Sequence, residues 1–266
     1  DYMYKYYKEK VIILIDEYDV PIQDGYINGY YDDIINLIKG VFSSALKDND
    51  SLYFGIMTGV LRVSKESLFS DLNNVMIYGI LDNSYNECFG FTKDETNTLL
   101  KYYGLELDDK VKAMYDGYNF AGSEIYNPWS ILNYAYKKEL VPYWVNTSGN
   151  ELIRQLVKNV DDDIKVIIEK LLVGESIEFK YNPNITYSDF DNYKSKDDVI
   201  NLLFTSGYLT LSETYIDDYG NKVITARIPN YEVRNFLWEL LQKELLENTY
   251  VTDGMVKEFC NGKNIK

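Results

Sequence analysis

Histidine is absent from this sequence of 266 residues, and cysteine occurs only twice. Without histidine, Ser–His–Asp triads, His-ligated zinc and histidine acid–base catalysis are excluded. Any catalysis must therefore use carboxylates, Lys, Arg, Tyr, hydroxyl groups or a metal ion held by oxygen atoms. Two cysteines without a spacing pattern do not indicate a disulfide framework, and we expect a reduced, cytoplasmic setting.

Basic residues are scarce as well, because 27 Lys and Arg stand against 42 Asp and Glu and the net charge is −15. Free-standing nucleic-acid binding and anionic membrane surfaces both require clustered positive charge, so we expect neither partner. No apolar run approaches the ~18 residues of a membrane-spanning helix. The first residue is Asp1, not Met, and we expect the chain to be a piece of a longer protein.

The sequence also lacks a phosphate-binding loop of the form G-x-x-x-x-G-K followed by Ser or Thr. The nearest match runs from Gly117 to Gly122, but it has no Lys and lies among predicted helices. A nucleotide site in this chain would therefore lack the half that cradles the phosphates.

What is present indicates the C-terminal part of a parallel α/β ATPase-like core. The apolar runs VIILI (11–15) and LYFGIMTG (52–59) predict buried strands, and residues 31–48 carry apolar side chains at helical spacing. A strand, a connection of helix length and a second strand are typical of parallel sheets. We predict a third strand over 75–81, and Pro21, Asp24 and Gly25 predict a loop after the first strand.

Acidic residues follow the first predicted strand directly: Asp16, Glu17 and Asp19. In P-loop ATPases, an Asp at the end of such a strand holds the Mg²⁺ shell, and the next acid polarises the attacking water. We therefore assign Asp16 to the metal and Glu17 as the general base. The alternative is a strand that enters a solvated acidic loop.

The second predicted strand ends in Thr58, and Arg62 follows four residues later. Sensor-type ATPases place a polar residue at this strand end to contact the γ-phosphate, and Arg commonly meets the phosphoryl charge of the transition state. We assign both residues to catalysis. The alternatives are a strand-end hydroxyl and a surface cation, and Arg62 could act within one subunit or across an interface.

The rest of the chain changes character twice. From residue 89 helices predominate, and one begins in a capping box at Thr92 and Glu95. From residue 175 a strand, a helix, a hairpin and a long helix suggest a winged-helix-like module. The predicted fold class is α/β, and the predicted parts are a partial P-loop-type parallel sheet (1–88), an all-helical lid region (89–174), the winged-helix-like module (175–250) and a tail or linker (251–266).

Eight ordered stretches, covering about residues 10 to 240, resemble an AAA-ATPase-like family that is commonly fused to a C-terminal PD-(D/E)XK nuclease domain. Met114 departs from the family pattern, which usually has Trp before YDGY. The stretches are LIDEYDVPI (14–22), TGVLRVSKESLFSDLNN (58–74), FGFTKDE (89–95), YDGYNF (115–120), IYNPWSILNY (125–134), YWVNTS (143–148), LLFTSGYLT (202–210) and IPNYEVRNF (228–236).

This resemblance implies a fragment of an ATPase whose intact form uses ATP and Mg²⁺ and regulates an attached nuclease. It places the ATP-binding loop upstream of the DEYD strand, so that loop and the nuclease domain are the partners missing from this chain. The fragment alone is expected to be inactive. The resemblance leaves open whether the intact protein forms a homo-oligomer.

Two other functions fit parts of the sequence. Glu178 and Lys180 form an E-x-K pattern on a predicted strand, which with upstream Asp161, Asp162 and Asp163 could serve a Mg²⁺-dependent nuclease. Acids at a helix start and E-x-K on an exposed strand are the plainer interpretation. A non-catalytic protein-interaction or regulatory module is the second alternative. Residues 186–250 hold eleven acids and six Lys or Arg, so we expect no DNA binding there.

Overall fold

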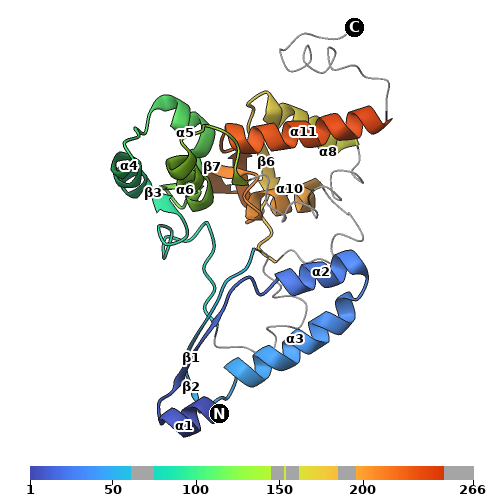
Figure 1. Ribbon diagram of the computed structural model, residues 1–266. Helices are drawn as coiled ribbons and strands as arrows, with labels where there is room; N and C mark the ends of the chain where they lie inside the picture. Colours follow the sequence, from blue (N-terminus) through green and yellow to red (C-terminus); the bar gives the residue numbers. More distant parts are fainter. Residues whose placement is uncertain (61–74, 145–152, 154–161, 185–195, 249–266) are drawn as a thin grey trace. The chain divides into compact units, whose positions relative to one another are not determined.

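The protein is seen in a computed structural model that describes residues 1–60, 75–144, 153, 162–184 and 196–248. These residues form helices, a small parallel sheet and antiparallel sheets (Figure 1), a mixture compatible with the predicted α/β class. None of the helices described is both long and apolar enough to cross a bilayer. The chain divides into two compact units, residues 1–77 with 182–206 and residues 78–181 with 207–266.

The first unit is built on two parallel strands. β1 pairs with β2 in parallel, with Ile15 opposite Met57, so the two predicted strands are confirmed. The predicted helix between them is also confirmed and supplies the long connection that parallel strands need. The elements of this unit are α1 (Tyr2–Tyr7), β1 (Val11–Ile15), α2 (Val20–Asn28), α3 (Tyr31–Leu46), β2 (Leu52–Met57) and α10 (Lys196–Thr205).

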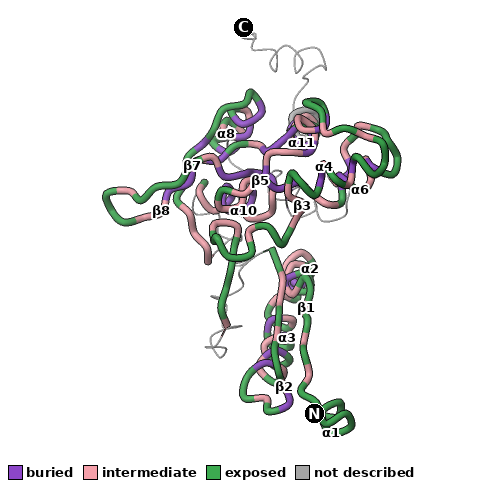
Figure 2. The backbone as a smooth tube through the Cα atoms, turned by 90° about the vertical axis from the view of Figure 1, so that its left-hand side faces the viewer, coloured by how far each residue is buried: buried purple, intermediate pink, exposed green. Residues whose placement is uncertain are grey.

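In the part of the chain that the structure describes, only one face of this sheet is covered. On that face, Leu46 of α3 lies so close to β2 that a Cβ added to Gly55 would be 2.9 Å from Leu46 Cδ2. The prediction of fully buried strands is wrong for the other face, and Figure 2 shows the exposed stretches of both strands. Four side chains paired across the sheet are 47% to 71% exposed there: Ile12, Leu14, Phe54 and Ile56.

The residues around Pro21 form a helix, and the predicted loop is wrong. Pro21 lies in the first turn of α2, where a helix does not need the missing N–H. Gly25 does not mark a turn, because a Cβ there would lie 2.4 Å from Ile34 Cγ2. This glycine allows α2 and α3 to pack closely.

The predicted third strand over 75–81 is also wrong, because these residues form no strand. Met76, Ile77 and Tyr78 are 79%, 44% and 47% exposed. A strand needs a neighbour that satisfies its backbone N–H and C=O groups. Among the described residues β2 pairs only with β1, so this apolar run has no strand to pair with.

The second unit combines helices with two antiparallel sheets, whose strand orders are β3-β5-β4 and β6-β8-β7. α4 begins at the predicted capping box, since Thr92 Oγ1 accepts a hydrogen bond from Glu95 N–H and Glu95 Oε2 accepts one from Thr92 N–H. The elements are β3 (Phe91–Thr92), α4 (Lys93–Tyr102), α5 (Asp109–Tyr115), β4 (Tyr118–Phe120), β5 (Ser123–Tyr126), α6 (Pro128–Lys137), α8 (Asp162–Leu172), β6 (Ile177–Lys180), β7 (Thr210–Ile216), β8 (Lys222–Arg227) and α11 (Tyr231–Asn248).

The region 89–174 is therefore not all helical as predicted. β4 and β5 form a hairpin in which Phe120 pairs with Ser123, leaving a two-residue turn at Ala121 and Gly122. Both turn residues have positive φ, 48° and 97°, as a type I′ turn requires. The segment GYNFAG, rejected above as a phosphate loop, contains the first strand and the turn of this hairpin.

The elements predicted for the C-terminal part are present in the predicted order. β7 and β8 form the hairpin, and β6 pairs with the other edge of β8. α10 groups with the first unit, however, whereas this sheet and α11 group with the second. A winged-helix arrangement of these elements stays a prediction, as do the predicted domain boundaries.

Candidate functional site at the ends of the parallel strands

The residues that follow β1 and β2 meet at one edge of the parallel sheet. Thr58 N–H donates to the carbonyl of Ile15 at 2.9 Å, and Tyr18 N–H donates to the carbonyl of Thr58 at 2.9 Å. The parallel pairing thus continues past both strands. By the two-residue alternation of strands, Asp16 and Thr58 continue the exposed face of the sheet.

The side chains of this junction are also joined. The Thr58 hydroxyl donates a hydrogen bond to Asp16 Oδ1, and its oxygen accepts one from Glu17 N–H at 3.2 Å. The structure therefore brings together three of the four predicted site residues. Arg62 lies outside the described residues, and its role stays a prediction.

Glu17 has an unusual backbone conformation, with φ of 51°. A residue with a Cβ loses roughly 1–2 kcal/mol in this left-handed region, so the surrounding contacts must stabilise it. Glu17 N–H is held by Thr58 Oγ1, and the Glu17 carbonyl accepts from Val20 N–H at 3.1 Å. A locally strained residue that is held this firmly is often found at functional sites.

Asp19 belongs to the same junction, although sequence reasoning gave it no role. The residue is 3% exposed, and its carboxylate accepts a hydrogen bond from Val60 N–H at 3.0 Å. Gly59 lies against it, because a Cβ there would be 2.8 Å from Asp19 Oδ1 and 2.6 Å from Tyr18 Cε1. The sequence signal for a role of Asp19 was its position directly before α2, where an Asp often caps the helix. Its side chain makes no capping hydrogen bond to α2, however.

The chemistry of these side chains fits one side of a Mg²⁺ site. Mg²⁺ is usually held by one or two carboxylates, several waters and the phosphates of its substrate. Asp16 and Glu17 provide exposed carboxylates at the strand ends. No group of three or more candidate metal ligands is present among the residues that the structure describes.

The nuclease alternative gains no support from the described residues. Glu178 and Lys180 lie on the exposed face of β6, where Glu178 accepts weak hydrogen bonds from Thr225 and Tyr215 at 3.4 and 3.5 Å. Asp163 is exposed at the start of α8, and Asp161 lies outside the described residues. The plainer interpretation of E-x-K as an exposed strand face is favoured.

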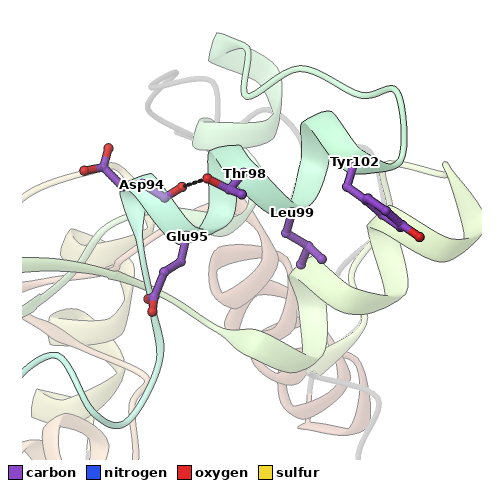
Figure 3. Close-up of a pocket in the computed structure, with 5 residues that line it drawn as sticks. All are labelled: Asp94, Glu95, Thr98, Leu99 and Tyr102. Atoms are coloured by element: carbon purple, nitrogen blue, oxygen red, sulfur yellow. Dashed lines mark hydrogen bonds between the residues drawn. The ribbon is translucent and has the colours of Figure 1, made fainter.

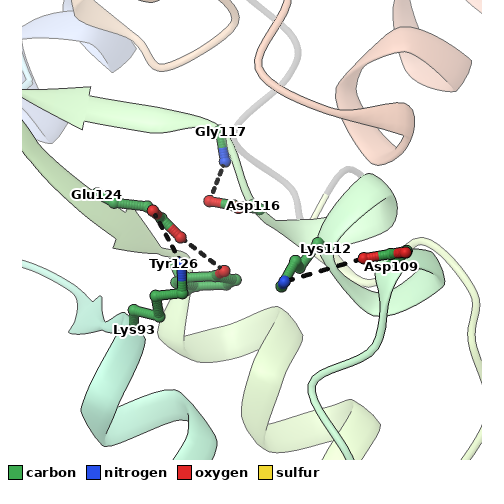
Figure 4. A network of polar contacts seen from close by, with 7 residues as sticks. All are labelled: Lys93, Asp109, Lys112, Asp116, Gly117, Glu124 and Tyr126. Atoms are coloured by element: carbon green, nitrogen blue, oxygen red, sulfur yellow. Dashed lines mark hydrogen bonds and ion pairs between the residues drawn. The ribbon is translucent and has the colours of Figure 1, made fainter.

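In a polar network of the second unit, the charged side chains contact other residues of the same unit (Figure 4). Tyr126 O–H donates to Glu124 at 2.9 Å, and Lys93 lies 3.6 Å from Glu124. Asp116 accepts from Gly117 N–H at 2.6 Å, and burial raises the pKa of Asp116. The Lys93–Glu124 ion pair joins α4 to β5, while the other two bonds lie within β5 and directly after α5, so we assign this network a structural role.

A shallow hollow on α4 is not assigned as a site either (Figure 3). Thr98 Oγ1 donates to the Asp94 carbonyl at 2.8 Å, and Tyr102 is 84% exposed. The hydrogen bonds from Thr92 lower the pKa of Glu95, whose carboxylate is engaged in the capping box. Ligand sites gather polar groups from several elements, whereas one helix supplies every lining residue here: Asp94, Glu95, Thr98, Leu99 and Tyr102.

Comparison with known proteins finds a family match in the N-terminal part of the chain and a relative that matches most of it. Residues 1–69 match a family described as Predicted AAA-ATPase, which supports an AAA-ATPase-like character for this segment. Over 238 residues, 88% of this chain, the sequence is 29% identical to a protein of Azotobacter chroococcum mcd 1 described as an uncharacterized protein in the vnfD 5′ region. The match covers 43% of that protein, so the chain spans less than half of its length. No solved structure matches the chain.

Proposed function

We propose that residues 1–69 contribute the metal-side half of the ATP site of an AAA-like ATPase. The observation that carries the proposal is the meeting of Asp16, Glu17 and Thr58 at the carboxyl edge of two parallel strands. Ligands of parallel α/β sheets bind at this edge. The family match covers the same residues.

In this proposal each charged residue has its own task. Asp16 holds the Mg²⁺ shell, and Glu17 accepts a proton from the attacking water. Arg62 meets negative charge that develops on the transferred phosphoryl group. When bound, Mg²⁺ would polarise the phosphoryl oxygens and neutralise part of their charge.

The half that binds the phosphates would come from outside this chain. No phosphate-loop pattern occurs in the sequence, and a large apolar face of a parallel sheet is normally covered. We propose that a phosphate-loop segment of the intact protein packs on this face, next to Asp16 and Thr58. This chain alone would then not hydrolyse ATP appreciably. The face consists of Ile12, Leu14, Phe54 and Ile56.

The ATP hydrolysis of the intact protein would regulate an attached nuclease, a part of the proposal that rests on the family resemblance of the sequence.

The second candidate function is a non-catalytic protein-contact module. The exposed apolar face also favours this function, because such faces mark interaction sites. An ATP site predicts that Asp16 contributes to Mg²⁺-dependent ATP binding, whereas a protein-contact module predicts no such contribution.

The experiment measures ATP binding to the intact protein with and without Mg²⁺. Asp16→Asn is expected to reduce the affinity gained from Mg²⁺ by about tenfold or more, and to leave Mg²⁺-independent binding unchanged. Asp24→Asn is the matched control, because Asp24 is an exposed acid on α2. An unchanged Mg²⁺ effect in Asp16→Asn, or no ATP binding at all, contradicts the proposal and favours the protein-contact module.

A further inference from the structure

The hydroxyl of Thr58 is already engaged by protein groups. A threonine hydroxyl has one proton to donate and two lone pairs that accept. Its proton is donated to Asp16 Oδ1, and one lone pair accepts from Glu17 N–H. While this arrangement persists, Thr58 has no proton left for a phosphate oxygen.

The backbone of Thr58 completes a run of four hydrogen bonds to consecutive residues. Its N–H bonds to the carbonyl of Ile15, and its carbonyl bonds to the N–H of Tyr18. With the two bonds of its hydroxyl, Thr58 contacts residues 15, 16, 17 and 18 in turn. A residue that only sensed a distant phosphate would not need this complete set.

A second contact, between Asp19 and Val60, joins the same two chain segments. The carboxylate of Asp19 accepts from Val60 N–H, two residues beyond Thr58 on the same strand end. Gly59 between them has no room for a side chain, with Asp19 Oδ1 only 2.8 Å from where its Cβ would be. The chain after β2 is therefore held on both sides of Gly59.

We propose that Thr58 is a positioning residue that orients the carboxylate of Asp16 and holds the backbone of Glu17. This inference rests on the proposed function for its catalytic consequence, and it replaces the sequence-based assignment of Thr58 as a phosphate sensor. Thr58 acts through the two acids. Its hydroxyl proton holds Oδ1 of Asp16 in place. Its hydroxyl oxygen accepts from Glu17 N–H and so stabilises the left-handed backbone conformation of Glu17.

The first test needs no nucleotide and uses this chain. Amide hydrogen exchange is measured for Glu17 in the wild type, in Thr58→Ser, which keeps the hydroxyl, and in Thr58→Val, which removes it at similar size. We expect Glu17 exchange to accelerate about fivefold in Thr58→Val, the ratio for one lost hydrogen bond, and to stay near wild type in Thr58→Ser. The Tyr18 amide, which bonds to the Thr58 carbonyl, should keep its protection in both variants. Equal Glu17 exchange in all three proteins overturns the proposal.

The second test uses ATP hydrolysis by the intact protein as a function of Mg²⁺ concentration. A positioning role predicts that Thr58→Val raises the Mg²⁺ concentration at half-maximal rate, that Thr58→Ser restores it, and that Thr58→Val adds little to Asp16→Asn. A phosphate sensor predicts instead that Thr58→Val lowers the maximal rate, leaves the Mg²⁺ concentration at half-maximal rate unchanged, and has an effect on the rate that adds to that of Asp16→Asn. This result would overturn the proposal. If the intact protein hydrolyses no ATP, the proposed function fails, and the Glu17 exchange result alone decides the role of Thr58.

Discussion

The buried carboxylate of Asp19 accepts a hydrogen bond from the backbone N–H of Val60 at 3.0 Å, which fastens the chain after β1 to the chain after β2. Asp16 and Thr58, which are joined by their own hydrogen bond, precede Asp19 and Val60 in these two chain segments. The third acid of DEYD therefore has a structural task, while the first two remain exposed.

Gly59 should tolerate no side chain. A Cβ there would lie 2.6 Å from Tyr18 Cε1, so Gly59→Ala should destabilise the chain by about 1–3 kcal/mol through overpacking. Gly40→Ala is the matched control, because nothing lies within 4 Å of its Cβ position in α3. That change should stabilise the helix by about 0.5–1 kcal/mol. Urea unfolding checks both values, and the same sign for the two variants would contradict the close contact.

The uncovered sheet face should contribute little to stability in this chain. Leu14 is 71% exposed, whereas Leu46 is 8% exposed and packs against Gly55. Leu14→Ala should change the free energy of unfolding by less than about 0.5 kcal/mol, and Leu46→Ala should cost about 2–4 kcal/mol. Binding of a fluorescent apolar dye should fall in Leu14→Ala. Comparable losses of stability in the two variants would mean that the face is covered.

Glu232 joins three segments of the second unit. It is 1% exposed, accepts a hydrogen bond from Ser130 Oγ at 2.7 Å, and accepts from the N–H groups of Tyr143 and Trp144. Glu232→Ala leaves these donors unsatisfied and should cost about 2–4 kcal/mol in urea unfolding. Glu239→Ala, an exposed acid on the same helix, should change stability by less than about 0.5 kcal/mol.

The same residue should give the stability a pH dependence. Burial raises the pKa of Glu232, and this effect outweighs the three hydrogen bonds that lower it. The folded state therefore binds the proton more tightly than the unfolded state. The contribution of Glu232 to stability is fully present below pH 4.5, the pKa of an ordinary Glu, and declines as pH rises through the raised pKa. Glu232→Gln should remove that part of the slope, and an unchanged slope would contradict it.

The C-terminal sheet should not bind DNA. Its exposed face and hairpin turn carry Glu178, Glu213 and Asp217, and hydrogen bonds from Asn221 lower the pKa of Asp217, so this acid stays charged. A mobility-shift measurement with a DNA duplex at low salt should show no complex at micromolar protein. Binding that weakens steeply with salt would show phosphate neutralisation and would overturn the prediction.

Local signals in the sequence predicted much of the secondary structure. The capping box at Thr92 and Glu95 predicted the start of α4, and the apolar runs predicted β1 and β2, because these patterns act within a few residues. The hairpin at Ala121 and Gly122 was missed, although its turn residues match a type I′ turn. Short strands of three or four residues are too brief for an alternation pattern to stand out.

Features that depend on a partner in space could not be predicted. The run over 75–81 has the composition of a strand, but strand formation requires a neighbouring edge. Gly25 and Pro21 looked like loop residues, yet one permits close helix packing and the other occupies a first turn. The meeting of Asp16 and Thr58 was predictable because parallel strands bring their carboxyl ends to one edge. The role of Asp19 was not, because nothing local pairs it with Val60.

The most direct measurement of the central claim is single-turnover ATP hydrolysis by the intact protein carrying Glu17→Gln. Glutamine keeps the size of the side chain and loses the base, so ATP should remain bound while hydrolysis slows by ~10²–10⁴-fold. Glu9→Gln is the matched control, because Glu9 is an exposed acid two residues before β1, and it should hydrolyse ATP at the wild-type rate. If Glu17→Gln hydrolyses ATP within about twofold of the wild type, a difference below ~0.5 kcal/mol in the barrier, then Glu17 is not the base, and the assignment of this strand edge to ATP hydrolysis is wrong.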